Sequence, residues 1–456
     1  MKTALQNYFD TLKNKRIYVI GMGVSNMPLI EKMLDAGLDV TACDRRLRSA
    51  FGGKIEALEE RGLSVCLGDD YLDHLDGAQV IFRTPGMRPD LPQLVAAIEQ
   101  GAQLTSEMEA FFQLCPCKII AVTGSDGKTT TTSIIAGLLK AAGYRTFVGG
   151  NIGHPLLCEV DDINPDDVVV LELSSFQLMT MRQSASVAVV TNLAPNHLDV
   201  HKDMDEYVDA KRNIFLHQES EDKLIINADN EITAAFSVQA RGEVVTFGRS
   251  TSADIRLKNG SISYHGHEIL QTRDIAIPGD HNQENYMAAI AAVDGLVPDE
   301  IIVSFAKSFG GVAHRIEFVR EVNGVRYYND SIASSPSRTI AGLHSFDQKV
   351  ILIAGGYDKH IPYDVLGPHI TECVKSLILT GDTSEKIQNA VLAAPDYRPG
   401  VPEITLCEDL ESAVKTAHAA AQPGDIVLLS PASASFDRFK NFEERGNRFK
   451  EFVQLL

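Results

Sequence analysis

The chain has 456 residues, 44% of them hydrophobic and 23% charged, which is typical of a globular protein of roughly two to four domains. Its 42 basic and 61 acidic residues give a formal net charge of −19, which argues against nucleic acid or an anionic membrane as the main partner but allows a locally held phosphate. The sequence has no apolar run of membrane-spanning length and no signal-peptide core, and its seven scattered cysteines predict free thiols, so we expect a cytoplasmic protein.

The first hundred residues alternate short apolar runs with amphipathic stretches, a pattern that predicts βαβ units and a parallel sheet. We expect a helix from about Met27 to Ala36 and another over Thr105–Leu114 that leads out of the domain. The expected strands are Arg16–Gly21, Asp39–Cys43 and Gln79–Arg83.

Polar and glycine residues follow these strands. Gly21 and Gly23 form a G-x-G turn after the first strand, but the third position of the dinucleotide fingerprint is Asn26. Asp44 closes the second strand, where an acidic residue can accept hydrogen bonds from a ribose or base, and Thr84-Pro85-Gly86 ends a later strand. These features predict a nucleotide-binding edge that is not tuned for NAD; a regulatory NAD-binding domain is the alternative.

A second α/β unit begins with a strand at Lys118–Val122 and a helix at about Lys128–Ala142. Short strands are expected between Glu243 and Leu270, where Asn259-Gly260 is a strong hairpin signal. This stretch predicts a small β excursion on the central domain. Further buried strands are expected at Val168–Leu173 and Val187–Asn192.

The loop between the first strand and helix of this unit, Thr123–Thr131 (TGSDGKTTT), is the most informative stretch. Its glycines let backbone N–H groups face a phosphate at a helix N-terminus. Lys128 can reach the β- and γ-phosphates of a nucleotide, and the Thr129 hydroxyl can bind Mg²⁺. The loop is shorter than the standard P-loop, because Val122 stands where that pattern needs its first glycine. The alternative is a tight turn with an exposed lysine.

Two residues past neighbouring strands are candidate metal ligands. Glu172 ends a run of buried aliphatics and His197 follows the next strand, so both lie at the edge where parallel sheets bind ligands. Carboxylate, imidazole and hydroxyl oxygen suit Mg²⁺ or Mn²⁺ better than zinc. The alternatives are that Glu172 caps a helix and that His197 is structural. Lys211 lies in a helical pattern, where a lysine is usually a solvated surface residue.

A third α/β unit starts near Val312, and the pattern changes predict domains at 1–106, 107–311 and 312–456. Ser335-Pro336 is typical of a helix start, with serine as N-cap and proline at the first helical position. The expected strands of this third unit are Arg326–Tyr328, Val350–Ala354, Ser376–Thr380 and Ile426–Leu429.

The phosphate loop and the segments LELSSFQL, TNLAPNHLD, AKRNIF, GDHNQENYMAA, AHRIE, YYNDS and SPASASFDRFKNFEERG occur in the order seen in the Mur ligases, which the chain resembles from Gly21 to Gly446. The resemblance implies an α/β protein of three domains. These are a Rossmann-like UDP-binding domain, a central P-loop-type ATPase domain with a small β excursion, and a Rossmann-like C-terminal domain. Ser430–Gly446 and the HRIE…NDS pair most resemble the D-glutamate-adding branch.

The activity implied by the resemblance is ATP-dependent formation of an amide bond between UDP-N-acetylmuramoyl-L-alanine and D-glutamate through an acyl phosphate, in peptidoglycan precursor synthesis. It implies small-molecule substrates, ATP with Mg²⁺ or Mn²⁺, and a monomer. One alternative is another Mur ligase that adds a different amino acid. Folylpolyglutamate synthase is a second, against which the uridine-type first domain argues. A non-catalytic nucleotide-binding regulator is a third, and the presence of Lys128, Glu172 and His197 argues against it.

The resemblance also implies site residues, with Lys128, Lys211 and His197 as the catalytic ones. The implied ATP contacts are Gly124, Ser125, Asp126, Gly127, Lys128, Thr129, Thr130, Asn282, Asn285, Arg315 and Asp330. The implied metal ligands are Thr129, Glu172, His197 and a carbamate carried by Lys211. The implied contacts to the UDP substrate are Val24, Ser25, Asp44, Arg45, Thr84, Gly86 and Asn151. The implied amino-acid site includes Ser334, Lys359, Ser435, Phe436 and Phe442.

The chain departs from the family where Ile332 stands in place of a usual lysine, and Ser334 stands where threonine is common. D-Glutamate brings two carboxylates, which need cations or N–H donors. We expect the helix start at Ser335-Pro336 and Arg338 in its first turn, together with Lys359, to take over from the missing lysine. The alternative is that Arg338 is simply exposed.

Overall fold

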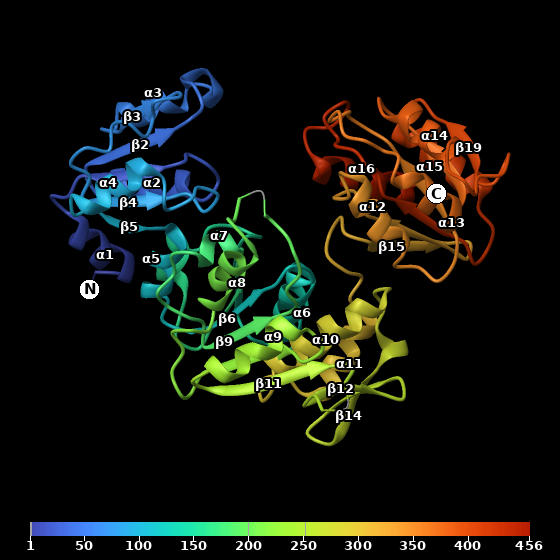
Figure 1. The fold of residues 1–456 in the computed structure, drawn as a ribbon, viewed down its shortest axis with the longest axis horizontal. Helices are drawn as coiled ribbons and strands as arrows, with labels where there is room; N and C mark the ends of the chain where they lie inside the picture. The colour runs from blue at the N-terminus through green and yellow to red at the C-terminus, as the bar shows by residue number, and fades with distance from the viewer. Residues whose placement is uncertain (1, 199, 251) are drawn as a thin grey trace. The chain divides into compact units, whose positions relative to one another are not determined.

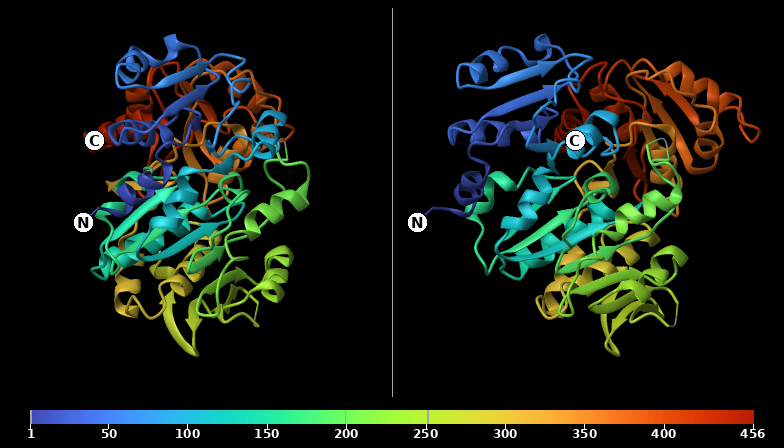
Figure 2. Two further views of the ribbon diagram at one scale, coloured as in Figure 1. Left: turned by 90° about the vertical axis from the view of Figure 1, so that its left-hand side faces the viewer. Right: turned by 60° about the vertical axis from the view of Figure 1, so that its left-hand side comes forward.

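The computed structural model describes residues 2–198, 200–250 and 252–456. Within these residues it is an α/β protein with three sheets, of five, nine and six strands, which confirms the expected fold class (Figures 1 and 2). Contacts divide the chain into two compact units. The first comprises Met1–Gln271 and Glu284–Phe305 and holds the first two sheets; the second comprises Thr272–Gln283 and Ala306–Leu456 and holds the third.

The first sheet is wholly parallel, with strand order β3-β2-β1-β4-β5. The three strands expected from buried aliphatic runs are present, whereas β3 and β5 were missed because they are short and largely polar or half-exposed. The strands are β1 (Ile17–Ile20), β2 (Val40–Asp44), β3 (Ser64–Leu67), β4 (Val80–Arg83) and β5 (Gln103–Thr105). The helices are α1 (Ala4–Leu12), α2 (Asn26–Asp35), α3 (Lys54–Glu59) and α4 (Pro92–Glu99).

The helix expected over Thr105–Leu114 begins later, so that prediction was wrong at its first residues. Thr105 ends β5, and Ser106 is the N-cap of α5 (Glu107–Leu114), with its hydroxyl accepting a hydrogen bond from the Glu109 N–H at 3.2 Å. The serine side chain satisfies one of the first N–H groups of the helix, which is why the helix starts after it.

The middle sheet has the order β14-β13-β12-β11-β10-β9-β6-β8-β7, parallel from β7 to β12 and antiparallel beyond. The predicted hairpin is confirmed: Lys258 pairs with Ser261, and both turn residues, Asn259 and Gly260, have positive φ, as a tight hairpin turn requires. The strands are β6 (Lys118–Thr123), β7 (Thr146–Gly150), β8 (Val168–Glu172), β9 (Val187–Val190), β10 (Lys223–Asn227), β11 (Glu243–Gly248), β12 (Ile255–Lys258), β13 (Ser261–Tyr264) and β14 (His267–Gln271).

Helix α6 (Lys128–Ala141) follows β6 and packs against β6, β7 and β8. In the middle of α6, Gly137 lies against the ring of Phe305 so closely that an added Cβ would overlap it. The other α-helices that follow α6 in the chain before β15 are α7 (Ser175–Leu178), α8 (Met204–Arg212), α9 (Glu231–Ala234), α10 (Asp280–Ala292) and α11 (Asp299–Ser308).

The first two sheets share a hydrophobic core and a buried arginine. Arg83, at the end of β4, is only 1% exposed, and its guanidinium donates to the Phe176 carbonyl and the Thr180 hydroxyl, both at 3.2 Å. The same group donates to the carbonyls of Pro85 and Met87. Arg83 therefore holds the loop after β4 and ties the first sheet to α7.

The third sheet has the order β15-β16-β20-β17-β18-β19, with only β15 antiparallel to its neighbour among the described strands. All four strands predicted here are present. The strands are β15 (Glu317–Val322), β16 (Val325–Asn329), β17 (Val350–Ala354), β18 (Val374–Leu379), β19 (Glu403–Leu406) and β20 (Ile426–Leu429). The helices are α12 (Pro336–Leu343), α13 (Leu366–Cys373), α14 (Ser384–Leu392), α15 (Leu410–Ala420) and α16 (Phe442–Gln454).

Helix α12 begins at Pro336 as predicted, with Ser335 in the N-cap position. The expected capping bond is not made, however, since among the described residues the Ser335 hydroxyl bonds to no N–H of the helix and lies 3.3 Å from the Ser337 hydroxyl. The first N–H groups of α12 are therefore not satisfied by a serine cap.

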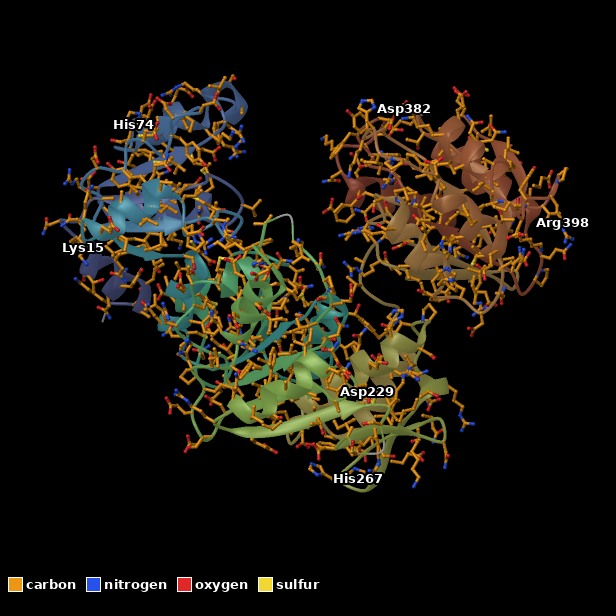
Figure 3. All side chains as sticks on the ribbon, viewed as in Figure 1. Lys15, His74, Asp229, His267, Asp382 and Arg398 are labelled. Atoms are coloured by element: carbon orange, nitrogen blue, oxygen red, sulfur yellow. The ribbon has the colours of Figure 1, made fainter. Side chains whose placement is uncertain are left out.

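Many charged side chains lie on the surface, as the labelled and exposed Asp229, Asp382 and Arg398 illustrate (Figure 3). All seven cysteines are free thiols, as expected. Of the helices in the described part of the chain, none combines the length and the apolar character needed to cross a membrane.

A buried carboxyl group joins two neighbouring strands of the third sheet. Asp330 follows β16, is 4% exposed, and accepts a hydrogen bond of 2.7 Å from the hydroxyl of Ser430, which follows β20. Burial raises the pKa of Asp330 to about 7, although the bonds from Ser430 and from the Ile316 N–H, and the charges of Arg315 and Arg338, oppose the rise.

We expect Gly137→Ala to destabilise the protein. Alanine favours a helix over glycine by about 1 kcal/mol, but overpacking against the Phe305 ring costs about 1–3 kcal/mol, so the clash should win. Urea unfolding followed by circular dichroism measures the change, since the chain has no tryptophan. The double variant Gly137→Ala/Phe305→Leu should recover part of the loss; no recovery would show that the ring is not the cause.

Asp330 should make stability depend on pH. Because the folded-state pKa lies near 7, above the usual value near 4, this group stabilises the fold at low pH and loses that contribution as pH rises through 7. Asp330→Asn should therefore gain roughly 2–3 kcal/mol relative to wild type between pH 5 and pH 8. Unfolding midpoints of both proteins across this range test the sign, with exposed Asp347→Asn as the control. A difference that falls with pH would contradict the assignment.

Candidate active site

The phosphate loop connects β6 to α6 at the carboxyl edge of the middle sheet, between the ends of β8 and β9. Two of its N–H groups are already engaged: Ser125 donates to the Asn192 carbonyl at 2.8 Å, and Asp126 donates to the Asn192 side chain at 3.0 Å. Gly127, with φ of 78°, is the N-cap of α6, and no side chain of the described residues caps this helix. The start of α6 is thus suited to an anion, and phosphate would meet the N–H groups from Gly127 onward.

The side chain of Ser125 fixes the shape of the loop. Its hydroxyl lies 2.9 Å from the Tyr207 hydroxyl and from both the N–H and the carbonyl of Ala194. Thr191 adds a bond of 2.6 Å to the Asp126 carbonyl. Sequence reasoning missed Tyr207 and Asn192, although Tyr207 lies one helical turn before Lys211 and so shares its face of α8.

Two lysines converge on the loop. The Lys128 Nζ lies 2.9 Å from the Gly124 carbonyl and 2.8 Å from the Ser125 carbonyl. The Lys211 Nζ, from α8, lies 2.9 Å from the same Gly124 carbonyl and 3.0 Å from the Thr123 hydroxyl. Lys211 is 1% exposed, so the alternative of a solvated surface lysine is wrong.

Burial lowers the pKa of Lys211 well below its usual value, and the charge of Lys128 lowers it further, against the opposing effect of Glu172 and Asp126. An amine in this position is held toward its neutral form. A neutral amine is the form that reacts with carbon dioxide, so the environment suits a carbamate.

Glu172 ends β8 next to Asn151. Its Oε1 accepts a bond of 2.7 Å from the Asn151 side chain, and its main-chain carbonyl accepts one of 2.8 Å from the Asn151 N–H. Its Oε2 is buried and has no hydrogen-bond partner among the described residues. A buried carboxylate oxygen without a donor fits a cation. The helix-cap alternative for Glu172 fails, since Ser174 caps α7 and no side chain caps α6.

The other two candidate metal ligands, His197 and Thr129, come from the loop after β9 and from α6. His197 lies in an exposed loop after β9, has φ of 55°, and its ring lies edge-on to Phe176 at 5.2 Å. Thr129 and Thr130 are half-buried in the first turn of α6. β8 and β9 flank β6, so the chain enters this region from three adjacent strands.

Asn285, on α10, also contacts the phosphate loop. Its Oδ1 accepts a bond of 3.2 Å from the Thr131 hydroxyl, and it lies where a Cβ on Gly127 would be. Asn282, one turn earlier on α10, is buried and donates to the Pro278 carbonyl at 2.6 Å.

At the edge of the first sheet, the Asp44 carboxylate is held by the Met22 N–H at 2.7 Å and by the Arg46 guanidinium at 2.8 and 2.9 Å. Burial raises its pKa, but these bonds outweigh burial and lower the pKa below its usual value. Sequence reasoning singled out Arg45, which is exposed and 3.7 Å from Asp69, and missed Arg46.

The other residues implied for the UDP substrate lie on the loops after β1 and β4. Val24 is 80% exposed, Ser25 is half-buried and Gly86 is exposed. Thr84 packs on Gly21, which explains why this position of the turn has no side chain. An exposed aliphatic side chain such as that of Val24 is suited to contact a ligand.

In the second unit, the positive charges of Arg315 and Arg338 both act to lower the pKa of Asp330. Arg338 is exposed on α12, and Ser334 is half-buried just before that helix. The Ile332 N–H donates to the His314 carbonyl at 3.1 Å, so this turn is held by its backbone. The charge of Arg338 therefore acts on the same buried carboxyl group as the charge of Arg315.

The closing motif supplies both exposed and buried groups. Phe436 is 62% exposed with its ring edge-on to Tyr357 at 5.9 Å, and Lys359 is exposed. Ser435 is buried, and its carbonyl accepts the Phe439 N–H at 2.8 Å. Phe442 begins α16 and lies edge-on to His314 at 6.0 Å.

A buried arginine that sequence reasoning missed holds this motif. The Arg445 guanidinium bonds to the hydroxyl and carbonyl of Ser331 and to the carbonyls of Ser433 and Ala434, at 2.8–3.1 Å. Burial lowers its pKa to about 10, so it stays charged at neutral pH. The position of Arg445 within FKNFEERG, part of a segment that resembles the family, was the signal from which the sequence could have identified it.

Comparison with known families covers most of the chain. Residues 15–106 match the N-terminal domain of MurD-like Mur ligases, residues 122–293 match the Mur ligase middle domain, and residues 314–433 match the glutamate ligase domain of Mur ligases.

Curated relatives match along their whole length. A protein of Acetivibrio thermocellus named UDP-N-acetylmuramoylalanine–D-glutamate ligase is 54% identical over 466 residues, covering 100% of both chains. Proteins with the same name from Ruminiclostridium cellulolyticum and Clostridium botulinum are 52% and 49% identical, again over 100% of both chains.

Solved structures show the same fold at low identity. A UDP-N-acetylmuramate–alanine ligase from Thermotoga maritima aligns with a TM-score of 0.58 at 19% identity, covering 97% of this chain and 100% of that one. A pseudomurein peptide ligase from Methanothermus fervidus aligns with a TM-score of 0.53 at 18% identity, with the same coverage. With relatives about half identical along the full length and three matching domain models, the chain belongs to the Mur ligase family.

Proposed function

We propose that this chain is the ligase that joins D-glutamate to UDP-N-acetylmuramoyl-L-alanine in peptidoglycan precursor synthesis. The full-length identity of 54% to a ligase named for these two substrates carries the proposal. The site geometry supports it, because a phosphate-binding helix start, two converging lysines and a carboxylate oxygen suited to a cation occur in one unit.

The proposed cofactors are ATP and Mg²⁺ or Mn²⁺. ATP would meet the loop from Gly124 to Thr130 and Asn285, and the family resemblance adds Asn282, Arg315 and Asp330 to the proposed nucleotide contacts. Glu172, His197 and Thr129 would hold the metal, with a carbamate on Lys211 as a further ligand. The bound cation would offset negative charge on the phosphoryl group during its transfer.

The residues of the chain have separate parts in this chemistry. Lys128 and the N–H groups at the start of α6 would stabilise charge on the transferring phosphoryl group, which is most of what such catalysis requires. The neutral amine of Lys211 would add to carbon dioxide, forming a C–N bond and releasing a proton, and so become an anion. The substrate carboxylate, once phosphorylated, becomes an acyl phosphate that the amine of D-glutamate attacks, with phosphate as the leaving group.

The substrates would be divided among three domains at 1–106, 107–311 and 312–456. The loops carrying Val24, Ser25, Asp44, Arg45, Thr84 and Gly86 would contact the UDP part, and Asn151 the reacting end. D-Glutamate would be bound by Arg338 and Lys359 with the Ser334, Ser435, Phe436 and Phe442 region. The Asp44 carboxylate oxygens already accept hydrogen bonds from Met22 and Arg46. The residues around Asp44 are therefore stronger candidates than Asp44 itself for contacts to the UDP part. A monomer in the cytoplasm, where ATP is available, fits these small substrates.

A phosphate-release assay with ATP and UDP-N-acetylmuramoyl-L-alanine tests this proposal. We expect release with D-glutamate and little with L-glutamate, D-alanine, L-alanine or meso-diaminopimelate, because the relatives are named for D-glutamate. Equal release with no amino acid would contradict a ligase. Activity with another amino acid, or with a folate substrate, would instead favour another member of the wider family.

Lys211→Ala should lower turnover by about a hundredfold or more, the cost of removing a preorganised charge from such a site. Acetate or formate should restore part of the activity by supplying the missing carboxylate. The control is Lys140→Ala, an exposed lysine at the end of α6, which should keep wild-type turnover. If Lys211→Ala is nearly as active as wild type, the lysine has no part in the reaction.

A further inference from the structure

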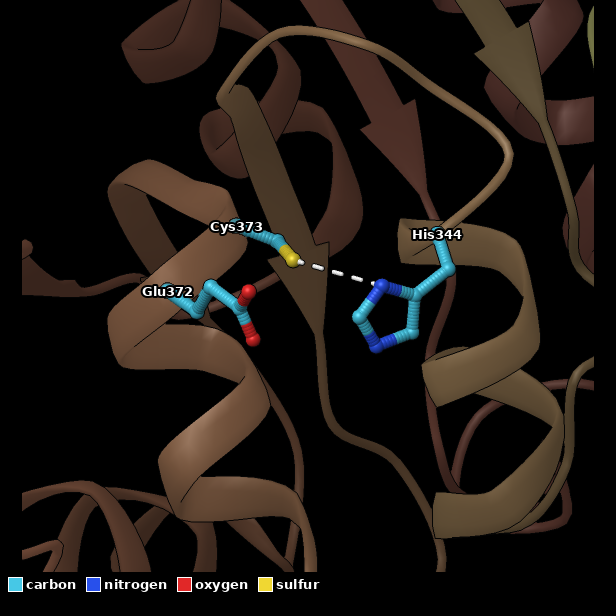
Figure 4. A group of neighbouring side chains, drawn as sticks. All are labelled: His344, Glu372 and Cys373. Atoms are coloured by element: carbon cyan, nitrogen blue, oxygen red, sulfur yellow. Dashed lines mark hydrogen bonds between the residues drawn. The ribbon is translucent and has the colours of Figure 1, made fainter.

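Three side chains of metal-ligating type converge in the second unit, and none of them has been assigned a role above. His344 is the C-cap of α12, and Glu372 and Cys373 are the last residues of α13 (Figure 4). One donor atom from each, an imidazole nitrogen, a carboxylate oxygen and a thiol sulfur, lie within 4.8 Å of one another. The ends of two packed helices thus present three different donors to one point.

A second histidine orients the first. The His344 Nε2 lies 2.9 Å from the His369 Nδ1, and the two rings are perpendicular, with centroids 5.0 Å apart. When His344 Nε2–H donates to His369, its Nδ1 carries the lone pair, and that Nδ1 lies 3.9 Å from the Cys373 sulfur. A hydrogen bond from the far nitrogen of a ligating histidine is the usual device that sets its tautomer in metal sites.

The spacing is close to what a small cation needs. Zinc binds sulfur at about 2.3 Å and nitrogen or oxygen at about 2.0–2.2 Å, so donors of a tetrahedral site lie about 3.5 Å apart. The present separations, up to 4.8 Å, close to that value with modest side-chain rotations. Glu372 is exposed and Cys373 half-buried, so the donors are accessible from solvent.

The donor set selects the metal class. Thiolate with imidazole and one carboxylate suits zinc and its neighbours, whereas Mg²⁺ and Ca²⁺ prefer oxygen alone. Cys373 is the one sulfur donor of this set, so a metal–sulfur bond is the signature of binding here.

We propose that His344, Glu372 and Cys373 form a binding site for a zinc-class divalent cation, with His369 orienting His344. The fourth position of such a site is left for water. A bound cation would link the end of α12 to the end of α13 and stabilise the C-terminal unit. The site shares no residue with the phosphate loop, so it stands or falls independently of the proposed activity.

Cobalt titration of the metal-free, full-length protein without nucleotide tests the site. Co²⁺ bound by Cys373 gives a sulfur-to-cobalt charge-transfer band in the near ultraviolet, which the oxygen and nitrogen ligands proposed beside the phosphate loop would not produce. Wild type should show the band at one Co²⁺ per chain, and Zn²⁺ should abolish it. Cys373→Ser and His344→Gln are the test variants. Cys407→Ser, a half-buried cysteine of the same unit, is the matched control.

The band should disappear in Cys373→Ser, weaken at least tenfold in apparent affinity in His344→Gln, and remain in Cys407→Ser. Zn²⁺ should also raise the thermal midpoint of wild type but not of Cys373→Ser, provided that circular dichroism shows the variant folded. The proposal is overturned if wild type has no band, if Cys373→Ser keeps it, or if Zn²⁺ raises the midpoint of both proteins equally.

Discussion

The burial of the Lys211 amine against the Gly124 carbonyl is the interaction on which the candidate active site depends. Desolvation disfavours the charged form of this amine, so burying it is costly unless neighbouring groups accept its hydrogen bonds. Thr123 and Gly124 accept from it, Tyr207 lies under it with its ring centroid 5.0 Å from the Nζ, and the hydroxyl of that tyrosine reaches Ser125. One helix, α8, thereby sets both the electrostatics and the shape of the loop after β6.

The local charge of this site differs from that of the protein as a whole. The chain is acidic by 19 charges, yet Lys128 and Lys211 meet at one carbonyl oxygen beside the start of a helix. Short-range groups dominate, since charges more than about 10 Å apart at the surface are screened by salt. The charge of Glu172 opposes the lowering of the Lys211 pKa, and its buried Oε2 has no hydrogen-bond partner among the described residues. The anionic nucleotide and the cation proposed for this site would complete the balance of charges.

The second unit uses buried polar groups for positioning. Arg445 gathers four backbone and hydroxyl oxygens from the turn at Ser331 and the segment at Ser433, and Asp330 joins β16 to β20 through Ser430. Such groups are stable in a core only when their hydrogen bonds are met. They hold the loop that carries Ser435 and Phe436 and the start of α16 at Phe442, and these three residues are proposed to meet the amino acid. The His344–Cys373 cluster lies at the other end of α12 and is available for a separate role.

Local pattern was sufficient for much of this protein. Runs of buried aliphatics predicted the central parallel strands, Asn259-Gly260 predicted its hairpin, and Pro336 predicted the start of α12, because each depends on neighbours along the chain. Short strands with polar faces, such as β3, carry no such signal. The burial of Lys211 and the roles of Arg46, Arg83 and Arg445 depend on oxygen atoms that are distant in sequence or contributed by turns. Charge and desolvation act through space, so these roles follow from the packing of the folded chain and not from residue type or spacing.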